Sequence, residues 1–436
     1  MVGRDRLLLL GLDGLPLDLA QRLAPELPNL ARFAFQARSI EAELPELSPV
    51  NWTSLATAKG PEEHGIFGFS RLDPHSLRIS VASADHVACP TIFERLGQRG
   101  LVSRVINLPN TYPAKPLRGM LVAGFVAEEL HRAVYPPVLA SLLDGYQLEA
   151  DTRRGLADPA FLLEELHATL ASRRRALDLL WPDLDWDLIF FVLTDTDRLF
   201  HILFPALLDA AHPWRGPCME LLRAWDALLG EVLDRFEALP GPKRLMVIAD
   251  HGFTTLRTEV DLNAWLRQQG LLRLTHAPED EWDASVVAPD STAFALDPGR
   301  IYLNTRQRFP RGSLRPEQAR PLLSAIRNGL EGLTFEGERV MERVFTGAEL
   351  YPGPLLDRAP DLVCLARPGF DCKAKFDRTE IFGLHGRLGA HSAHGAIFYD
   401  SGGSAPARMR DAGAEILRHF GLDPAPVPTD RPALFC

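Results

Sequence analysis

The chain has 436 residues, of which 46% are hydrophobic and 24% are charged; this composition excludes a disordered chain and a disulfide-stapled miniprotein. The length suits one large domain with insertions, or two domains. Because 57 acidic residues outnumber 47 Lys and Arg residues and the net charge is −10, we expect no basic field for a nucleic-acid scaffold role.

The cysteines and the apolar runs predict where the protein resides. Its 5 cysteines are odd in number and never spaced as CxxC, so we expect neither a disulfide framework nor a thiolate zinc site. The first apolar run, residues 7–12, is shorter than a signal-peptide core, and no later run is long enough to cross a bilayer. These patterns predict a cytoplasmic protein without a membrane segment, and they leave the oligomeric state open.

Short apolar runs alternate with longer helical patterns along the chain, which is typical of a mostly parallel sheet covered by helices. The predicted buried strands are residues 6–11, 102–108, 187–193, 245–249 and 396–399. The predicted helices are residues 29–37, 91–99, 159–180, 218–239, 262–269, 316–330 and 405–420. The prediction is therefore an α/β fold with a mostly parallel central sheet flanked by helices.

The segment 253–387 differs from the rest of the chain, because it has short strand-like runs, turns such as FPRG and acidic loops such as PEDEWD. We interpret it as an inserted smaller subdomain or cap. Residues 1–252 and 388–436 would then form one core, which we expect to be catalytic.

Acidic residues follow three of the predicted buried strands: Asp13, then Asp195 and Asp197, then Asp250. The carboxyl ends of strands in an open α/β sheet share one edge, so we expect these carboxylates to converge. Each of them alone could be a turn former or a helix cap. Convergent carboxylates, however, repel one another unless cations lie between them.

Histidines add to the same edge. His251 follows Asp250 directly, and His201 lies four residues after Asp197, on the same face if a helix begins there. A later cluster adds three histidines, His385, His391 and His394. One such histidine alone could be an ordinary hydrogen-bonded loop residue. Because imidazole and carboxylate are ligands of zinc and similar ions, the combined set indicates two metal sites.

Ser48 and Pro49 have the residue order of a helix N-cap and first helical position, with an apolar helix continuing through Trp52. A hydroxyl there lies at the positive end of the helix dipole, which favours phosphate. Ser48 could simply cap this helix. A nearby metal ion could instead lower the proton affinity of its hydroxyl and make Ser48 a nucleophile.

These segments together resemble the alkaline phosphatase superfamily, in particular its type I phosphodiesterase/nucleotide pyrophosphatase branch and a group of bacterial phosphohydrolases. The resemblance covers most of the chain, and its motifs follow the order seen in that family. They are GLDG at 11–14, SPVNWTSLATAKGPEEHGIFGF at 48–69, VINLPNTYP at 105–113, TDTDRLFH at 194–201, IADHGF at 248–253, GRIYLNTRQRFPRG at 299–312 and GAHSAHGAIF at 389–398. The resemblance implies an alkaline-phosphatase-like fold.

The resemblance also implies two divalent cations, zinc in the first place and manganese as the alternative. The ligands that it implies are Asp13, Asp250, His251 and the Ser48 oxygen for one ion, and Asp197, His201 and His391 for the other. His391 is preferred to His394 because it matches the Gly-x-His position of the family. Asp195 is the alternative to Asp197, but only Asp197 stands four residues before His201.

The nucleophile and a nearby amide bear on the substrate. Ser48 stands where nucleotide pyrophosphatases commonly carry Thr, which makes the choice of substrate less defined. The resemblance gives Asn51 the role of donating a hydrogen bond to a nonbridging phosphate oxygen, although it could also be a polar residue of the first helical turn. We predict cleavage of phosphodiester or nucleotide pyrophosphate bonds through a phosphoserine intermediate on Ser48, with a small phosphate ester or nucleotide as substrate.

Other functions stay open. Within the superfamily the main alternative is a phosphomonoesterase; a sulfatase would need a C/S-x-P-x-R signature that the chain lacks at Cys89 and Ser48, and a mutase would need a transfer domain that we do not recognise. A noncatalytic binding protein that kept the fold, or a metal-free Ser-His-Asp hydrolase without a G-x-S-x-G elbow, belongs to a different class. Four aromatic residues could stack on a leaving group but are more often core residues: Trp52, Phe67, Phe69 and Tyr302.

Overall fold

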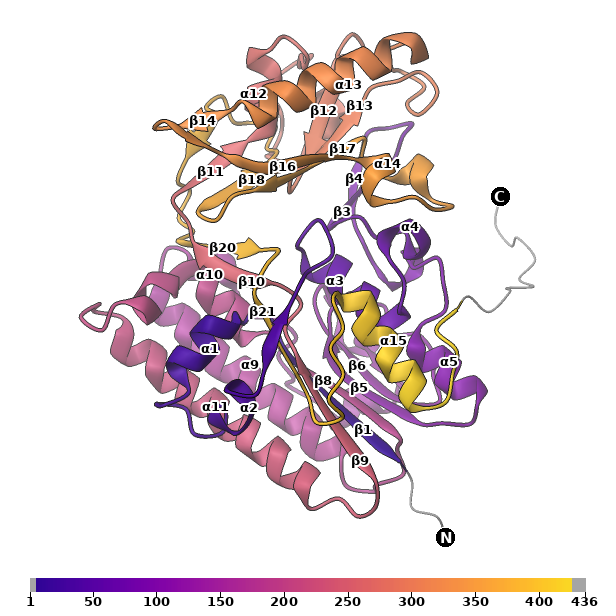
Figure 1. The fold of residues 1–436 in the computed structure, drawn as a ribbon, viewed down its shortest axis with the longest axis vertical. Coiled ribbons are helices and arrows are strands. Elements are labelled where there is room, and N and C mark those ends of the chain that lie inside the picture. The colour runs from indigo at the N-terminus through magenta and orange to yellow at the C-terminus, as the bar shows by residue number, and fades with distance from the viewer. Residues whose placement is uncertain (1–4, 426–436) are drawn as a thin grey trace.

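The computed structural model describes residues 5–425, and its main body is an eight-stranded sheet (Figure 1). Five parallel strands form its centre, in the order β9 (Lys243–Ile248), β1 (Arg6–Leu12), β8 (Leu188–Leu193), β5 (Ser103–Leu108) and β6 (Gly119–Ala123). Antiparallel pairings complete the two edges: β21 (Ala396–Asp400) pairs with β9 and β2 (Arg38–Ile40) with β21, while β7 (Val134–Tyr135) pairs with β6. The predicted α/β fold with a mostly parallel central sheet is confirmed.

The central strands form where the sequence is apolar without interruption. Every residue of β1 (RLLLLGL) and of β8 (LIFFVL) is buried. A strand in the middle of an open α/β sheet has helices on both faces, so both of its faces must be apolar. For this reason the five predicted strands lie within two residues of the observed ones.

Two groups of helices cover the sheet (Figure 1). One group consists of α9 (Pro159–Leu180), α10 (Asp195–Leu208) and α11 (Arg215–Glu237), which pack against one another. The other consists of α3 (Ser48–Thr57), α5 (Ile92–Gln98) and α15 (Met409–His419). Shorter helices of the main body are α1 (Leu17–Leu23), α4 (Pro61–His64), α6 (Leu130–Ala133), α7 (Leu139–Leu142) and α8 (Thr152–Gly155).

One predicted helix is much shorter than expected. Residues 29–37 contain only the single turn α2 (Ala31–Ala34). The carboxylate of Asp226 in α11 accepts hydrogen bonds from the N–H groups of Asn29 and Leu30, at 3.1 and 2.8 Å. This contact from a distant helix sets where the turn begins, and the chain then turns into β2.

Residues between β9 and β21 form a smaller unit, drawn above the main sheet in Figure 1. Its two larger sheets have the orders β12–β13–β17–β16 and β18–β11–β19. Their strands are β11 (Thr258–Asp261), β12 (Ala293–Leu296), β13 (Arg300–Leu303), β16 (Met341–Thr346), β17 (Leu362–Ala366), β18 (Phe370–Lys373) and β19 (Phe382–Gly383). The other elements are α12 (Leu262–Gln268), α13 (Pro316–Glu331), α14 (Gly347–Leu350), β14 (Thr334–Phe335) and β15 (Glu338–Arg339).

The smaller unit has its own hydrophobic cluster, separate from that of the main sheet. The buried members of this cluster come from residues 260–376, with one exception. Leu77 reaches it from the hairpin of β3 (Ser70–Leu72) and β4 (Ile79–Val81). The assignment of 253–387 as an inserted subdomain stays a prediction.

The chain leaves and re-enters the main body through two antiparallel strands, β10 (Gly252–Thr255) and β20 (Gly389–Ser392). In this pair Phe253 lies opposite His391. Because β10 directly follows His251, the pairing brings His391 to the carboxyl edge of the main sheet, although the two histidines are far apart in the sequence.

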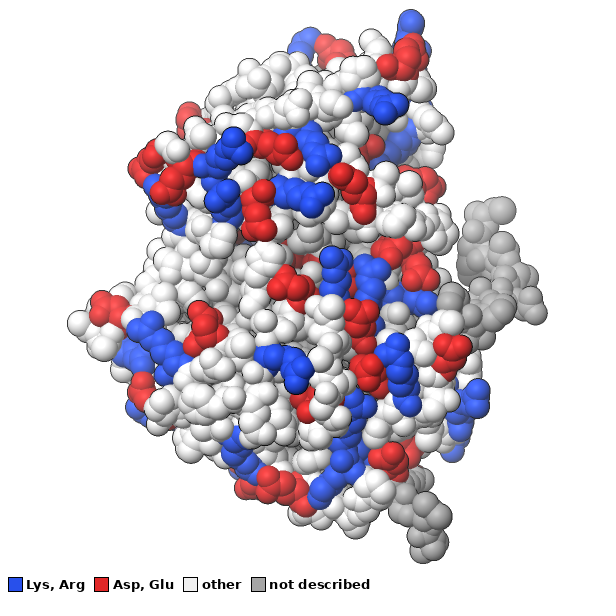
Figure 2. Space-filling view, viewed as in Figure 1, with Lys and Arg blue, Asp and Glu red and all other residues white. Residues whose placement is uncertain are grey.

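No helix within residues 5–425 has the length and apolar character needed to cross a membrane. On the face drawn in Figure 2, acidic and basic side chains are interspersed over both the main body and the smaller unit.

Candidate active site

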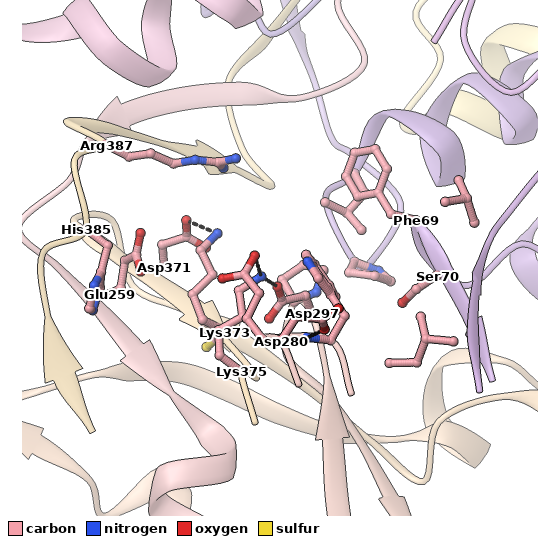
Figure 3. Close-up of a pocket in the computed structure, with 18 of the residues that line it drawn as sticks. Phe69, Ser70, Glu259, Asp280, Asp297, Asp371, Lys373, Lys375, His385 and Arg387 are labelled. Atoms are coloured by element: carbon pink, nitrogen blue, oxygen red, sulfur yellow. Dashed lines mark hydrogen bonds and ion pairs between the residues drawn. The ribbon is translucent and has the colours of Figure 1, made fainter. Parts of the chain in front are cut away.

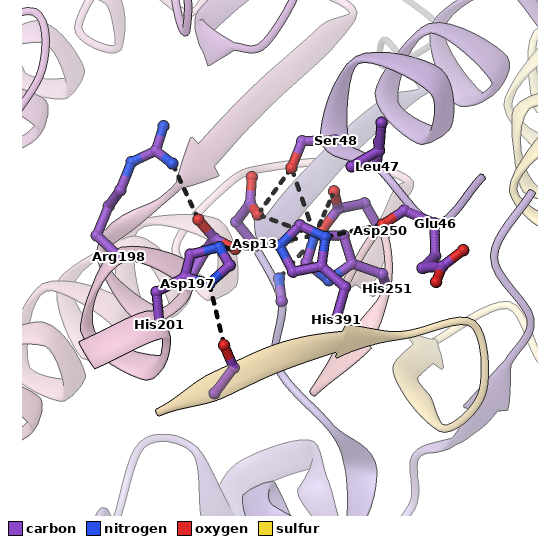
Figure 4. Close-up of polar contacts among 12 residues, drawn as sticks. Asp13, Glu46, Leu47, Ser48, Asp197, Arg198, His201, Asp250, His251 and His391 are labelled. Carbon is purple, nitrogen blue, oxygen red and sulfur yellow. Dashed lines mark hydrogen bonds and ion pairs between the residues drawn. The ribbon is translucent and has the colours of Figure 1, made fainter. Parts of the chain in front are cut away.

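The structure brings three carboxylates together at the carboxyl edge of the sheet (Figure 4). Asp13 follows β1, Asp197 lies in the first turn of α10 after β8, and Asp250 follows β9. These strands are neighbours in the order β9–β1–β8, so their ends lie side by side. All three carboxylates are buried.

The possible metal-binding atoms form two overlapping groups. The donor atoms of Asp13, Asp250 and His251 lie within 4.8 Å of one another, and so do those of Asp197, His251 and His391. His201 adjoins the second group, since its Nε2 lies 3.0 Å from His391 Nε2 and 3.4 Å from Asp197 Oδ1. The structure therefore brings together every Asp and His that the resemblance implies as a metal ligand, and His251 belongs to both groups.

Ser48 is the first residue of α3, whereas the N-cap is Leu47, and no side chain caps this end of the helix. The interpretation of Ser48 as a capping residue is therefore wrong. Its Oγ instead lies 3.4 Å from Asp13 Oδ1 and 3.4 Å from His251 Nε2. The hydroxyl faces the first donor group from the positive end of the α3 dipole.

The two glycines of the GLDG motif have different physical roles. Trp52 Nε1 donates to Asp13 Oδ2 at 2.9 Å, and its ring packs so closely over Gly11 that a Cβ there would lie 2.6 Å from it. Gly14 has a φ of 68°, in the left-handed region that favours glycine, and its N–H donates to Asp250 Oδ1 at 3.1 Å. Gly11 thus makes room for the ring that holds Asp13, and Gly14 permits the turn that holds Asp250.

Backbone carbonyl groups orient the three histidines. The distances are 2.8 Å from His391 Nδ1 to Glu46 O, 3.0 Å from His251 Nδ1 to Gly252 O, and 3.4 Å from His201 Nδ1 to Gly389 O. Because a carbonyl oxygen only accepts, each Nδ1 carries the proton and each Nε2 presents a lone pair to the carboxylates. A neutral imidazole held in this way is the form that binds a metal ion.

Burial and mutual repulsion change the acidity of the carboxyl groups. Burial and the charge of Asp197 raise the pKa of Asp250 to about 7. Burial, with the charges of Asp250 and Asp197, raises the pKa of Asp13 well above its ordinary value. Burial also acts to raise the pKa of Asp197, but His201, His391 and Arg198 outweigh it and hold this pKa well below its ordinary value. The carboxylates therefore repel one another unless a cation joins them.

The side chains present fit divalent cations. Asp250 Oδ2 is buried and lacks a hydrogen-bond partner within residues 5–425, although an unpaired buried oxygen costs free energy. Burial lowers the pKa of His201 and of His251, which keeps their Nε2 atoms free to bind. Cations in the two donor groups would satisfy the unpaired oxygen and compensate the carboxylate charges.

Asn51 does not reach the donor groups. Its Oδ1 accepts a hydrogen bond from the N–H of Glu43 at 2.6 Å, and its Nδ2 donates to the carbonyl oxygens of Glu43 and Leu47 at 3.2 and 3.1 Å. Both amide hydrogens are in use, so none is left for a phosphate oxygen. This geometry contradicts the predicted phosphate contact: Asn51 ties the segment before Ser48 to the first turn of α3.

The alternative ligands lie outside the donor groups. Asp195 accepts a hydrogen bond from the Thr169 hydroxyl at 3.0 Å. His394 is about half exposed and pairs with Glu41 and Glu342. His385 is exposed and lines the neighbouring cavity.

The aromatic residues singled out in the sequence have mostly structural positions. Trp52 and Tyr302 are buried, and Tyr302 stacks on Phe294. Phe67 packs edge-on against Tyr351. Phe69 differs, since it lines the cavity that adjoins Ser48.

A cavity of about 1030 Å³ lies between the donor groups and the smaller unit. Ser48, Asp197, His201 and His391 line it from the main body. From the smaller unit and the segment that leads back to β20, its wall includes Asp371, Lys373, Lys375 and Arg387 (Figure 3).

Arg198 also lines this cavity, and the sequence analysis did not single it out. Its Nη1 donates to Asp197 Oδ2 at 3.0 Å and its Nη2 to Glu149 Oε2 at 3.4 Å. The sequence does place Arg198 directly after Asp197 in the TDTDRLFH motif, and this position could have indicated that it belongs to the site.

A family model described as type I phosphodiesterase / nucleotide pyrophosphatase matches residues 7–393. The chain belongs to this family. It is therefore a hydrolase that acts on phosphoric ester bonds, and the predicted type I phosphodiesterase/nucleotide pyrophosphatase family is confirmed. The family is typically metal-dependent, and the two donor groups could bind metal ions.

Solved structures of other proteins have the same fold as this chain. Phosphonoacetate hydrolase from Sinorhizobium meliloti 1021, in complex with phosphonoformate, has 17% sequence identity and a TM-score of 0.61 over 94% of each chain. Murine ectonucleotide pyrophosphatase / phosphodiesterase 5 has 14% identity and a TM-score of 0.57 over 97% of this chain and 96% of that one. An inactive variant of the murine protein in complex with AMP has 13% identity and a TM-score of 0.58, with the same coverage. No curated protein matches the chain.

Proposed function

We propose that the chain cleaves phosphodiester or nucleotide pyrophosphate bonds, with Ser48 as the nucleophile and two divalent cations, zinc or else manganese. The residues that would hold them are Asp13, Asp250, His251 and the Ser48 oxygen for one ion, and Asp197, His201 and His391 for the other. The observation that carries the proposal is the position of Ser48 Oγ, 3.4 Å from both Asp13 Oδ1 and His251 Nε2.

Divalent cations at these residues would act as Lewis acids on phosphate oxygens and lower the proton affinity of the Ser48 hydroxyl. Ser48 gives its hydroxyl proton to solvent and its Oγ attacks the phosphorus: the Oγ–P bond forms as the bond to the leaving group breaks, and the leaving oxygen keeps the electron pair. Water then attacks the same phosphorus, and breaking the Oγ–P bond releases the phosphorylated product. Ser48 regains a proton from solvent.

In-line displacement places the leaving group opposite the nucleophile. Figure 4 shows Ser48 at the top of the cluster and His201 at its lower left, with Asp197 beside His201. The leaving oxygen is therefore expected beside Asp197, His201 and His391. The positive end of the α3 dipole, at Ser48, is suited to stabilise the nonbridging oxygens.

The test compares a diester, bis-p-nitrophenyl phosphate, with a monoester, p-nitrophenyl phosphate, after treatment with EDTA and after return of zinc or manganese. We expect hydrolysis of the diester only with metal present, and a loss of at least about 1000-fold in Ser48→Ala. Ser141→Ala changes an exposed serine and serves as the control. Preference for the monoester would instead support the phosphomonoesterase alternative, and hydrolysis that survives EDTA would rule out the proposed mechanism.

A further inference from the structure

Arg387 stands directly before two residues whose backbones hold His201. The N–H of Leu388 donates to the carbonyl oxygen of His201 at 2.9 Å, and the carbonyl oxygen of Gly389 lies 3.4 Å from His201 Nδ1. The carbonyl oxygen of Leu388 in turn accepts from the N–H of Leu256 at 2.9 Å. The backbone next to Arg387 is thus fixed to the same part of the site as His201.

The Arg387 side chain lines the cavity and makes no ion pair or hydrogen bond within residues 5–425. Figure 3 shows its guanidinium extended into the cavity, and no dashed line reaches it. The neighbouring cations differ, because Lys373 pairs with Asp371 at 2.6 Å and Lys375 pairs with Asp297 at 2.6 Å. Arg387 is therefore a partly buried positive charge in this wall, and none of the described carboxylates pairs with it.

The backbone contacts of Leu388 and Gly389 place Arg387 beside His201. The proposed in-line displacement puts the leaving group at the same place. The guanidinium of Arg387, which extends into the cavity, is available there to an anion.

We infer that Arg387 binds an anionic group, a phosphate or a carboxylate, on the leaving group of the substrate. This inference rests on the proposed function, because attack by Ser48 defines which side the leaving group takes. A guanidinium donates two parallel hydrogen bonds to such a group, and charge-assisted bonds of this kind are the strong ones. Arg387 thereby selects substrates whose leaving group carries its own negative charge.

Pyrophosphate is a compact anionic leaving group of this kind. Acidic residues of the 279–283 loop line another part of the same cavity, where Glu281 pairs with Lys375 at 3.1 Å. Figure 3 shows Asp280 well apart from Arg387, so these acidic residues do not occupy the place of the proposed anion.

Two substrates that transfer the same group test the inference. Thymidine 5′-triphosphate and the p-nitrophenyl ester of thymidine 5′-monophosphate would both give thymidine monophosphate on Ser48. In the first the bond between Pα and the bridging oxygen breaks and pyrophosphate leaves; in the second p-nitrophenolate leaves, and it carries no charge of its own while bound. Both are assayed at the same free metal concentration.

Arg387→Ala is expected to lower kcat/KM for the triphosphate about 10- to 100-fold, which is the range expected for the loss of one or two charge-assisted hydrogen bonds. For the ester, kcat/KM should fall less than about 3-fold. Pyrophosphate should inhibit hydrolysis of the ester less well in the variant, by the same factor as the triphosphate loses. Arg311→Ala is the matched control, since Arg311 is an exposed arginine between β13 and α13 that does not line the cavity.

Equal losses for the two substrates would overturn the inference, because Arg387 would then act on the transferred phosphate or on the fold. An unchanged triphosphate rate with unchanged inhibition by pyrophosphate would overturn it as well. If the unmodified protein with metal hydrolyses neither substrate, the proposed function is wrong and the inference is wrong with it. If it hydrolyses both but Arg387→Ala gives either of the results above, only the inference is wrong.

Discussion

The imidazole of His391 stacks on that of His251, with ring centroids 3.7 Å apart and ring planes inclined by 22°. This contact fixes the plane of the His391 ring, while the hydrogen bond from Nδ1 to Glu46 O fixes its rotation. As a result Nε2 points at Asp197 Oδ1, 3.1 Å away. The Nε2 atom of His391 is thus positioned by His251, the histidine that the two donor groups share.

The first prediction concerns two histidines three residues apart. His391→Ala is expected to weaken metal binding and kcat/KM by at least about 100-fold, because it removes a proposed ligand; loss of a group that merely orients a ligand already costs 10- to 100-fold. His394→Ala is the matched control, because its ion pairs with Glu41 and Glu342 lie at the surface and contribute little. Elemental analysis and kinetics measure both effects. If His394→Ala lost its metal and His391→Ala kept it, His394 rather than His391 would be the ligand.

The second prediction concerns Asn51. Asn51→Ala should destabilise the protein by about 2–4 kcal/mol, because buried backbone groups of Glu43 and Leu47 lose their hydrogen-bond partners. Urea unfolding measures this loss. The folded variant should keep its metal, and its kcat should stay within a few-fold of the original. A large fall in kcat at unchanged stability would restore the phosphate contact that the sequence analysis predicted.

The third prediction concerns the metal-free protein and pH. The pKa of Asp250 is raised from 3.8 to about 7, so the folded chain binds this proton more tightly than the unfolded chain does. The corresponding stability is fully present below about pH 4 and is lost as the pH rises to about 7. In EDTA the stability of the unmodified protein relative to that of Asp250→Asn should therefore fall by about 3 kcal/mol across this window. The comparison with the variant is needed because the lowered pKa values of His201 and His251 act on the stability of both proteins in the opposite direction.

Asp250→Asn should remove much of this pH dependence, because an amide does not ionise. Zinc should also suppress it in the unmodified protein, because a bound cation favours the charged carboxylate. Asp144→Asn changes an exposed residue and should leave the pH dependence as it was. If the difference in thermal midpoint between the unmodified protein and Asp250→Asn in EDTA does not change between pH 4 and 7, the prediction is wrong.

The carboxylates at the sheet edge could be predicted because their positions follow from topology. β9, β1 and β8 are parallel neighbours, so the residues after them must share an edge whatever the details of packing. The place of His391 could be predicted only from the family resemblance. It depends on the pairing of β10 with β20, two strands that are far apart in the sequence, and no local pattern in the sequence reports such a pairing.

The sequence predictions were wrong where a single tertiary contact decides between two similar local conformations. Leu47 rather than Ser48 is the N-cap of α3, a shift of one residue that frees the hydroxyl. The Asn51 amide bonds to the backbone of Glu43, whose position depends on how the preceding segment folds. Similarly, Asp226 determines where α2 begins. Propensity and spacing contain no information about these partners.

The fourth prediction concerns Arg198, which joins Asp197 to Glu149 and lies over the ring of Phe125 with its guanidinium carbon 4.4 Å from the ring centroid. By holding Asp197 Oδ2, the guanidinium leaves Oδ1 facing His391. Arg198→Ala should therefore lower metal affinity and kcat about 10- to 100-fold, as expected for a group that orients a ligand, with little change in KM.

Arg198→Lys separates this positioning role from charge alone. A lysine has one terminal nitrogen and cannot reproduce the fork that reaches both carboxylates, so it should recover only part of the loss. Arg174→Ala is the control, because its pair with Glu231 has a well-exposed arginine and should be worth less than about 1 kcal/mol. Titration with zinc and steady-state kinetics provide the two readouts. If KM rises while metal affinity stays unchanged, Arg198 contacts the substrate itself, and its contact with Asp197 does not determine metal binding.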